Sequence, residues 1–188
     1  MTCVVGYIKG TDVWMGSDSW VGDAMSYGKL KGAKVTPHSV DGLQHPILIG
    51  WAGALRLATV IERMAFPPMV DDHRRWVDSL FIDVLRKAMW EAGYLRWEDG
   101  YEQTPEPNAL LIGFSGHLYR MYEGLEILEV AQPYASIGIG ELHADGAFAA
   151  MENIKPAIAP KRRVELALKA AATHSPYVAP PFTIFRTG

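Results

Sequence analysis

Hydrophobic and polar residues alternate along the first part of the chain in short runs that are typical of β-strands. Residues 2–8 (TCVVGYI) and 13–17 (VWMGS) are rich in β-branched and aromatic side chains, and residues 9–12 (KGTD) between them suit a tight turn. This pattern predicts a β-hairpin. Residues 18–39 are polar and contain several glycines, which predicts a loop with a weak strand, whereas residues 47–52 (ILIGWA) predict a third strand.

After the third predicted strand, the hydrophobic period changes from that of a strand to that of an α-helix. Apolar residues recur every three or four positions over residues 54–65, and Pro67-Pro68 ends the predicted helix. A second helix is predicted over residues 72–92. Residues 93–107 are polar, aromatic and proline-containing, which indicates a surface segment.

The second half of the chain shows the same order of strands followed by helices. The predicted elements are strands over residues 109–114, 117–122, 126–130 and 135–139, a helix that carries Ala144 to Met151, a helix over 160–174, and a last strand over 182–185. Strands joined by hairpins form antiparallel sheets, and helices that come in pairs suggest a helical layer on each face. We expect one domain over residues 1–188, either a four-layer α/β/β/α sandwich of antiparallel sheets or a simpler two-layer α+β domain. Periodicity alone does not separate the two.

The composition is that of an ordinary soluble globular domain. Of the 188 residues, 49% are hydrophobic and 21% are charged, and the formal net charge is −3. The chain lacks the basic excess of nucleic-acid-binding proteins, and no apolar run is long enough to span a bilayer. The first residues contain no basic leader before an apolar region, so we expect no signal peptide and a cytoplasmic protein.

The cysteine and histidine content argues against metal and dinucleotide sites. The single cysteine, Cys3, excludes a disulfide within the chain and a multi-cysteine zinc site, and we interpret it as a small buried hydrophobic residue. The six histidines are scattered, and His143 stands where a dinucleotide-binding fingerprint would have its third glycine. We therefore expect neither a metal ion nor an organic cofactor.

The first candidate for chemistry is Thr2, which follows Met1 and lies on the first predicted strand. If Met1 is removed, Thr2 carries both a hydroxyl and an α-amine, and such an amine, with a pKa of about 7.7–8.0, can accept the hydroxyl proton near neutral pH. Asp18 and Lys34 follow at intervals of sixteen residues, and Gly53 precedes the first predicted helix. Taken singly, each has an ordinary explanation as a turn residue, a solvated lysine or a helix-start glycine.

Taken together, these positions resemble the proteasome β-subunit family of N-terminal nucleophile hydrolases, which includes the bacterial HslUV-type peptidase. In that family a mature N-terminal Thr is followed at fixed offsets by an Asp, a Lys and an Ala-Gly pair, and Thr2, Asp18, Lys34 and Ala52-Gly53 match these positions. The order of predicted elements fits over essentially the whole chain. The resemblance implies the four-layer α/β/β/α fold and a threonine-type endopeptidase.

The resemblance also implies a role for each matching residue. Thr2 attacks the peptide carbonyl with its own amine as general base, and Lys34 favours the alkoxide and lowers the pKa of that amine. Asp18 holds Lys34 charged and oriented. The backbone N–H of Gly53, at a helix N-terminus, stabilises the oxyanion of the tetrahedral intermediate.

Trp51 matches the family position at the base of the pocket for the substrate side chain that precedes the scissile bond. A bulky indole there would shorten the pocket and favour small side chains, or close it. The alternative is a Trp packed in the core under the first helix. By the same alignment, Val21, Gly32 and Leu55 are its neighbours in the pocket.

The resemblance further implies a homo-oligomeric ring or related assembly that acts on peptides or unfolded proteins, served by an ATP-dependent unfoldase. Two positions depart from the family. Ile139 stands in a Gly-x-Gly turn where the family has an assisting Ser, and residues 173–177 (THSPY) contain no Asp where the family has an Asp and a Ser. Two alternatives therefore stay open: a catalytically silent assembly subunit, and an N-terminal-nucleophile amidase acting on a small amide.

Overall fold

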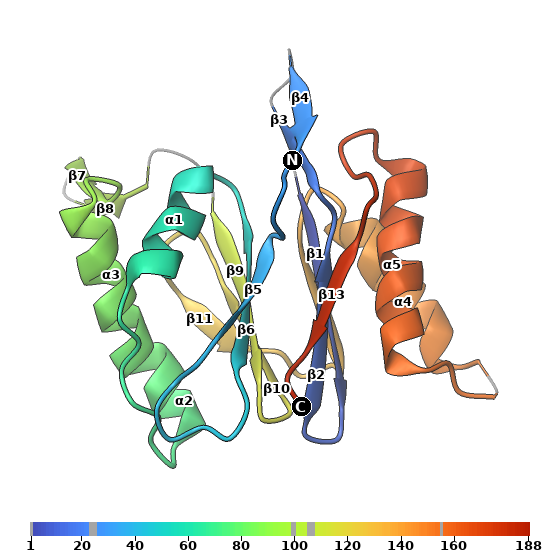
Figure 1. Ribbon diagram of the computed structural model, residues 1–188, viewed down its shortest axis with the longest axis horizontal. Helices are drawn as coiled ribbons and strands as arrows, with labels where there is room; N and C mark the ends of the chain where they lie inside the picture. Colours follow the sequence, from blue (N-terminus) through green and yellow to red (C-terminus); the bar gives the residue numbers. More distant parts are fainter. Residues whose placement is uncertain (1, 23–25, 99–100, 105–107, 155) are drawn as a thin grey trace.

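The computed structural model describes residues 2–22, 26–98, 101–104, 108–154 and 156–188, and its strands and helices form distinct layers (Figure 1). The strands are β1 (Cys3–Lys9), β2 (Asp12–Ser17), β3 (Trp20–Gly22), β4 (Tyr27–Lys29), β5 (Val35–His38), β6 (Ile47–Ala52), β7 (Arg96–Glu98), β8 (Tyr101–Gln103), β9 (Ala109–Phe114), β10 (His117–Met121), β11 (Ile127–Glu129), β12 (Tyr134–Gly138) and β13 (Thr183–Arg186). The helices are α1 (Leu55–Arg63), α2 (His73–Arg75), α3 (Ile82–Glu91), α4 (Glu141–Glu152) and α5 (Pro160–His174), with a π-helical segment, Trp76–Phe81, between α2 and α3.

The two larger sheets are antiparallel throughout the described residues, which confirms this part of the predicted fold class. The first sheet has the strand order β12-β1-β2-β13, and the second has the order β11-β10-β9-β6-β5. Two hairpins, β3-β4 and β7-β8, lie outside these sheets. Both sheets bring together strands from the two halves of the chain, because β12 pairs with β1 and β9 pairs with β6.

Three groups of buried side chains join the sheets and helices. One lies between the sheets and includes Val4, Met15 and Leu111. The other two lie on the outer faces of the sheets, where α4 and α5 cover the first sheet and α1 and α3 cover the second (Figure 1). Burying a large aliphatic or aromatic side chain contributes about 1.5–3 kcal/mol, so these apolar faces account for the pairing of each sheet with its helices.

Several predicted elements are confirmed to the residue, among them the strands at residues 47–52 and 109–114 and the helix at 160–174. Two segments contain more structure than predicted. The weak strand expected within residues 18–39 corresponds to β3, β4 and β5, and the segment 93–107, expected as a surface excursion, contains β7 and β8. These additional strands have only three or four residues each, too few for a clear period.

The helix predicted over residues 72–92 is present but contains the π-helical segment. Residues five positions apart lie about 140° apart around an α-helix but nearly one full turn apart in a π-helix. The π-helical turn therefore allows Trp76 and Phe81 to face the same core, where both are fully buried and their ring centroids are 5.6 Å apart. Among the described residues, every helix is too short or too polar to cross a membrane.

Candidate active site

Thr2 lies directly before β1, at the end of the first sheet from which the β3-β4 hairpin projects (Figure 1). Only 3% of the residue is exposed, and its backbone carbonyl accepts a hydrogen bond from the Gly140 N–H at 3.4 Å. Thr2 contributes to the wall of a hollow of about 210 Å³. The other residues of the wall are Ala52, Gly53, Asn108, Ala109, Gly138 and Ile139.

Asp18 is brought beside the start of the chain by the β1-β2 hairpin. The hairpin pairs Val4 with Ser17, so the next positions along the two strands, Cys3 and Asp18, lie opposite each other. The Cys3 N–H donates to Asp18 Oδ1 at 2.9 Å, and the Trp20 N–H donates to Asp18 Oδ2 at 2.9 Å. The spacing of Thr2 and Asp18 along the chain thus places the carboxylate next to the residue that follows Thr2.

Lys34 approaches the same carboxylate from the second sheet. It directly precedes β5, and the two sheets come close together at Gly50, where an added Cβ would lie 2.4 Å from Val4 Cγ1. At this point of close approach, Lys34 Nζ lies 2.9 Å from Asp18 Oδ1 and also donates to the Trp20 carbonyl. The second and third residues of the predicted catalytic set are therefore in direct contact.

The Asp18–Lys34 ion pair is fully buried, with 0% of either side chain exposed. Desolvation by burial lowers the pKa of Lys34, and the Asp18 carboxylate opposes that change. Removing two charges from water costs several kcal/mol for each ion, which a close pair offsets only with further hydrogen bonds, and the Asp18 carboxylate accepts one from each of three donors. A buried group whose pKa is shifted by desolvation and by a specific charge partner is a candidate for a functional site.

Two glycines shape the hollow beside Thr2. Gly53, just before α1, has a φ of 114°, and Gly138, at the end of β12, has a φ of 91°. Both values lie in the left-handed region that glycine adopts without strain. At Gly138 the space is also limited, because an added Cβ would lie 2.4 Å from the Thr2 carbonyl oxygen. The backbone beside Thr2 therefore requires glycine at this position.

The variant Gly138→Ala is expected to lower the free energy of unfolding by about 2–5 kcal/mol, through left-handed strain and overpacking against Thr2. Gly146→Ala is the matched control, since Gly146 lies inside α4 with no atom within 4 Å of an added Cβ. It should stabilise the protein by about 0.5–1 kcal/mol. Urea denaturation of both variants measures the difference, and equal stabilities would contradict the predicted strain.

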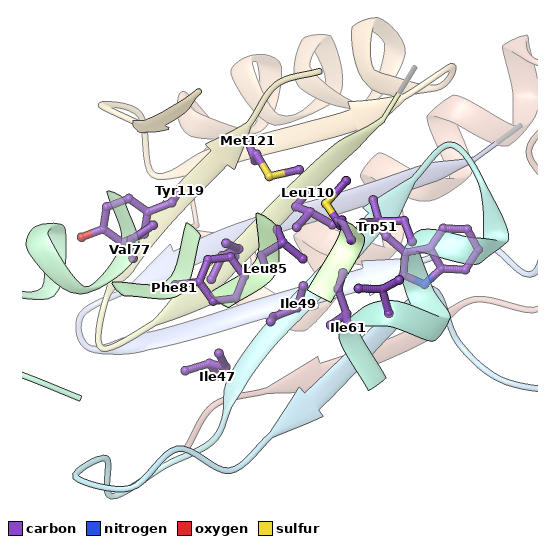
Figure 2. Close-up of a cluster of buried hydrophobic side chains, with 14 of the residues drawn as sticks. Ile47, Ile49, Trp51, Ile61, Val77, Phe81, Leu85, Leu110, Tyr119 and Met121 are labelled. Atoms are coloured by element: carbon purple, nitrogen blue, oxygen red, sulfur yellow. The ribbon is translucent and has the colours of Figure 1, made fainter. Parts of the chain in front are cut away.

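The four residues predicted for the substrate pocket are not among those that line this hollow. Trp51 is buried on the helix-covered face of the second sheet, in a core that also contains Ile61 and Leu110 (Figure 2). Leu55 is exposed on the first turn of α1, Val21 lies on β3, and Gly32 lies between β4 and β5. The Trp51 indole thus contributes to the hydrophobic core, and its role at the base of a pocket remains a prediction.

Cys3 is buried in the core between the first sheet and α4 and α5, as expected for a small hydrophobic residue. Desolvation raises the pKa of its thiol from 9.0 to about 12, and the nearby Asp18 carboxylate adds to this effect. Because the thiolate is the reactive form, Cys3 is unsuited to be the nucleophile.

We expect Cys3 in the native protein to react with iodoacetamide near pH 8 at least about 100-fold more slowly than in the urea-unfolded chain, since the native thiol is both buried and protonated. The unfolded chain is the internal control for the intrinsic reactivity of the thiol. The two rates can be followed by mass spectrometry. Equal rates would show that Cys3 is accessible.

The two departures from the family pattern lie near the hollow and after the last long helix. Ile139 lines the hollow and is 53% exposed, so an apolar side chain faces the place where the family has a hydroxyl. Ser175, directly after α5, is buried, and its Oγ accepts a hydrogen bond from the Tyr177 N–H at 3.3 Å. Its hydroxyl is therefore engaged within its own turn.

A buried asparagine that the sequence analysis did not identify also lines the hollow. Asn108 Oδ1 accepts hydrogen bonds from the Ala54 N–H at 3.3 Å and from the Tyr94 hydroxyl at 2.8 Å. An isolated Asn before an apolar strand carries no motif, and only the fold reveals its partners. Among the described residues, no group of three or more His, Cys, Asp or Glu side chains is arranged to hold a metal ion.

Solved structures with a similar fold extend over nearly the whole chain. BPH from Thiobacillus denitrificans, which has also been solved in complex with epoxomicin, has a TM-score of 0.76 at 18% identity, covering 99% of this chain and 97% of BPH. HslV from Trypanosoma brucei has a TM-score of 0.68 at 16% identity, covering 98% of each chain. The Anbu complex from Pseudomonas aeruginosa, solved as a helical assembly, has a TM-score of 0.66 at 13% identity, covering 99% of this chain and 80% of Anbu.

No protein-family model matches the sequence, and no curated protein is detectably similar to it. The similarity is therefore one of structure, and at these identities it establishes the fold. The chain has the proteasome-like fold that BPH, HslV and Anbu share, which confirms the predicted resemblance at the level of the fold.

Proposed function

We propose that this protein is a threonine peptidase that hydrolyses peptide bonds through an acyl-enzyme on Thr2, after removal of Met1 has freed the α-amine of Thr2. The observation that carries the proposal is the buried Asp18–Lys34 pair, which is hydrogen-bonded to the residue next to Thr2. The proteasome-like fold supports it.

We also interpret the two sheets and their helices as the four-layer α/β/β/α sandwich of a single domain.

In the proposed reaction, the Thr2 hydroxyl oxygen attacks the carbonyl carbon of the peptide while its proton passes to the α-amine of the same residue. The Gly53 N–H donates a hydrogen bond to the oxyanion that forms. The protonated amine then gives its proton to the leaving nitrogen as the C–N bond breaks, which leaves an ester on Thr2. Water, deprotonated by the free amine, attacks the ester and releases the acid product and Thr2.

Lys34 would assist this reaction electrostatically. Its positive charge favours the Thr2 alkoxide and, as a like charge, lowers the pKa of the α-ammonium, so that more of the amine is free to act as a base. Asp18 keeps Lys34 charged despite its burial. Because the pair is excluded from water, the field of Lys34 at Thr2 is screened less than it would be at the surface.

The proposed substrates are peptides or unfolded proteins. From the resemblance, we propose that Val21, Gly32 and Leu55 form a pocket with Trp51 at its base, and that the bulk of the indole keeps this pocket shallow and favours small side chains before the scissile bond. Cleavage of a peptide library, read by mass spectrometry, measures the preference directly.

We propose that copies of the chain form a homo-oligomeric assembly. Ile139, which lines the hollow, and Leu142, at the start of α4, are exposed hydrophobic side chains that a neighbouring copy could cover. The solved helical assembly of Anbu has the same fold. An ATP-dependent unfoldase that delivers unfolded chains is the partner implied by the resemblance to HslUV-type peptidases.

Mass spectrometry of the native protein tests the proposed function. Met1 itself lies outside the described residues, so the experiment first asks whether the purified chain begins at Thr2. Epoxomicin, which is bound to BPH in its solved complex, should then add its mass once per chain at the peptide that begins with Thr2. A preparation that retains Met1 is the matched control, because its α-amine is blocked, and it should remain unlabelled.

The main alternative is a catalytically silent subunit that serves only in assembly. Ile139 favours it, because the residue presents an apolar side chain to the hollow where the family has an assisting hydroxyl. A native protein that retains Met1, or that begins at Thr2 but neither binds epoxomicin covalently nor cleaves any peptide, would support this alternative and exclude the peptidase.

A further inference from the structure

We infer that Asn108 is a positioning residue that holds the peptide after Gly53, so that the Gly53 N–H points at the substrate carbonyl. The inference rests on the proposed function, since it concerns the oxyanion donor of that reaction. It is argued from the contacts of Asn108 with Ala54 and Tyr94 and from the pairing of β6 with β9.

Asn108 lies where the β6-β9 ladder ends. The last pair of that ladder joins Ala52 to Ala109, so Gly53 and Asn108 are the next residues on the two strands. Asn108 Oδ1 then accepts the N–H of Ala54 at 3.3 Å. The residues on both sides of Gly53 are therefore held by the same segment, one through the ladder and one through the Asn108 side chain.

This double attachment fixes a backbone that would otherwise be free to rotate. Gly53 has a φ of 114°, a conformation that glycine adopts easily but that no side chain of its own can hold in place. The Gly53 N–H belongs to the peptide shared with Ala52, and the Ala54 N–H belongs to the following peptide. Holding both peptides fixes both dihedral angles of Gly53, and thus the direction of its N–H.

The N-cap residue of α1 makes no side-chain capping hydrogen bond of its own. That residue is Ala54, which has no side-chain oxygen to cap the first turn. Asn108 supplies an acceptor from outside the helix. Ordered donors at the oxyanion position are effective because they need no reorganisation during the reaction, so a residue that orders the donor acts on the rate.

Tyr94 fixes the orientation of the Asn108 amide. Its hydroxyl donates to Asn108 Oδ1 at 2.8 Å, and its own backbone N–H donates to the Met89 carbonyl at 2.9 Å, near the end of α3. The Ala54 N–H is a donor only, so the atom that it contacts must be the amide oxygen. With two hydrogen bonds on this oxygen, the amide is held in one orientation.

Steady-state kinetics of Asn108→Ala tests the inference. We expect kcat on a peptide substrate to fall about 10- to 100-fold while KM changes less than about twofold, because misplacing the donor acts on the transition state. The inhibition constant of a peptide aldehyde, whose adduct with Thr2 places an oxygen at the oxyanion position, should weaken by the same factor. The pH profile of kcat/KM should keep its apparent pKa, since the base is unchanged.

Tyr94→Phe is the milder variant, because it keeps Asn108 and removes one hydroxyl. We expect a smaller loss of kcat, about 3- to 10-fold, and no further loss when it is added to Asn108→Ala, because Tyr94 acts through Asn108. Asn153→Ala and Tyr122→Phe are the matched controls, since both residues are exposed and lie away from the hollow. Melting temperatures of all variants identify any that fail to fold.

The failure of the inference is distinguishable from the failure of the proposed function. If the wild-type protein cleaves peptides and Asn108→Ala and Tyr94→Phe both keep kcat within twofold, the inference is wrong and the peptidase stands. The inference would also be wrong if Asn108→Ala and Tyr94→Phe lowered kcat equally and the double variant showed the product of the two losses, because the two residues would then act independently. If the wild-type protein neither cleaves peptides nor reacts at Thr2, the proposed function is wrong, and the inference is wrong with it.

Discussion

Replacing Thr2 with alanine is expected to lower kcat for peptide hydrolysis by about 10⁴-fold or more, because the variant lacks the atom that forms the acyl-enzyme. The fold should be retained. The Thr2 backbone carbonyl, which accepts the hydrogen bond from Gly140, is unchanged, and the β1-β12 and β1-β2 ladders begin after this residue. The measurements are hydrolysis of a peptide substrate and the covalent addition of epoxomicin, followed on the same preparations.

Two further variants make this result specific. Thr2→Ser keeps a hydroxyl and an α-amine on the same residue, so it should keep measurable hydrolysis and covalent labelling. Thr11→Ala removes an exposed threonine at the β1-β2 turn and should leave both readouts unchanged. Full activity in Thr2→Ala would rule out the proposed nucleophile, whatever the other variants show.

Those parts of the fold that depend on local periodicity could be predicted from the sequence. Residues 47–52, 109–114 and 160–174 have the apolar patterns of a strand, a strand and a helix, and the structure begins and ends these elements at the same residues. The π-helical segment could not be predicted from the sequence. It is favoured because Trp76 and Phe81 pack in the same core, and this contact exists only in the folded chain.

The candidate site was predictable where a spacing along the chain corresponds to strand register. Asp18 lies opposite Cys3 because the β1-β2 hairpin has a short turn, so the number of residues between the two positions sets their register. The contact of Lys34 with Asp18 depends instead on the packing of two sheets at Gly50, and the resemblance to a known family, rather than periodicity, indicated it. Asn108 had neither signal, since its partners come from separate segments and meet only in the folded chain.

The second large effect is expected from Asp18→Ala, which leaves the Lys34 side chain buried without its carboxylate. Breaking a buried ion pair in this way costs about 3–5 kcal/mol of the free energy of unfolding. The pKa of Lys34, already lowered by burial, should fall further once the opposing effect of Asp18 is removed. Hydrolysis should fall steeply as well, because a neutral Lys34 no longer favours the Thr2 alkoxide.

The sign of the pH dependence follows from the lowered pKa of Lys34. Between its native pKa and its unfolded value of 10.5, the unfolded chain binds more protons than the native protein, so this group makes stability rise with pH. This pH range is wider in Asp18→Ala, because the native pKa of Lys34 is lower in the variant. Urea denaturation from about pH 6 to about pH 10 should therefore show the stability difference between wild type and variant shrinking as the pH rises.

Glu91→Ala is the matched control, because it breaks the exposed pair of Lys87 and Glu91 and should cost less than about 1 kcal/mol. The variant Asp18→Leu/Lys34→Met separates stability from catalysis. Replacing both charges with apolar side chains removes the desolvation cost of the two ions, so it should recover part of the stability lost in Asp18→Ala, although the Cys3 and Trp20 N–H groups still lack the carboxylate acceptor. It should stay inactive, because an apolar pair cannot lower the pKa of the Thr2 amine. Recovery of activity together with stability would mean that the ion pair serves the fold alone.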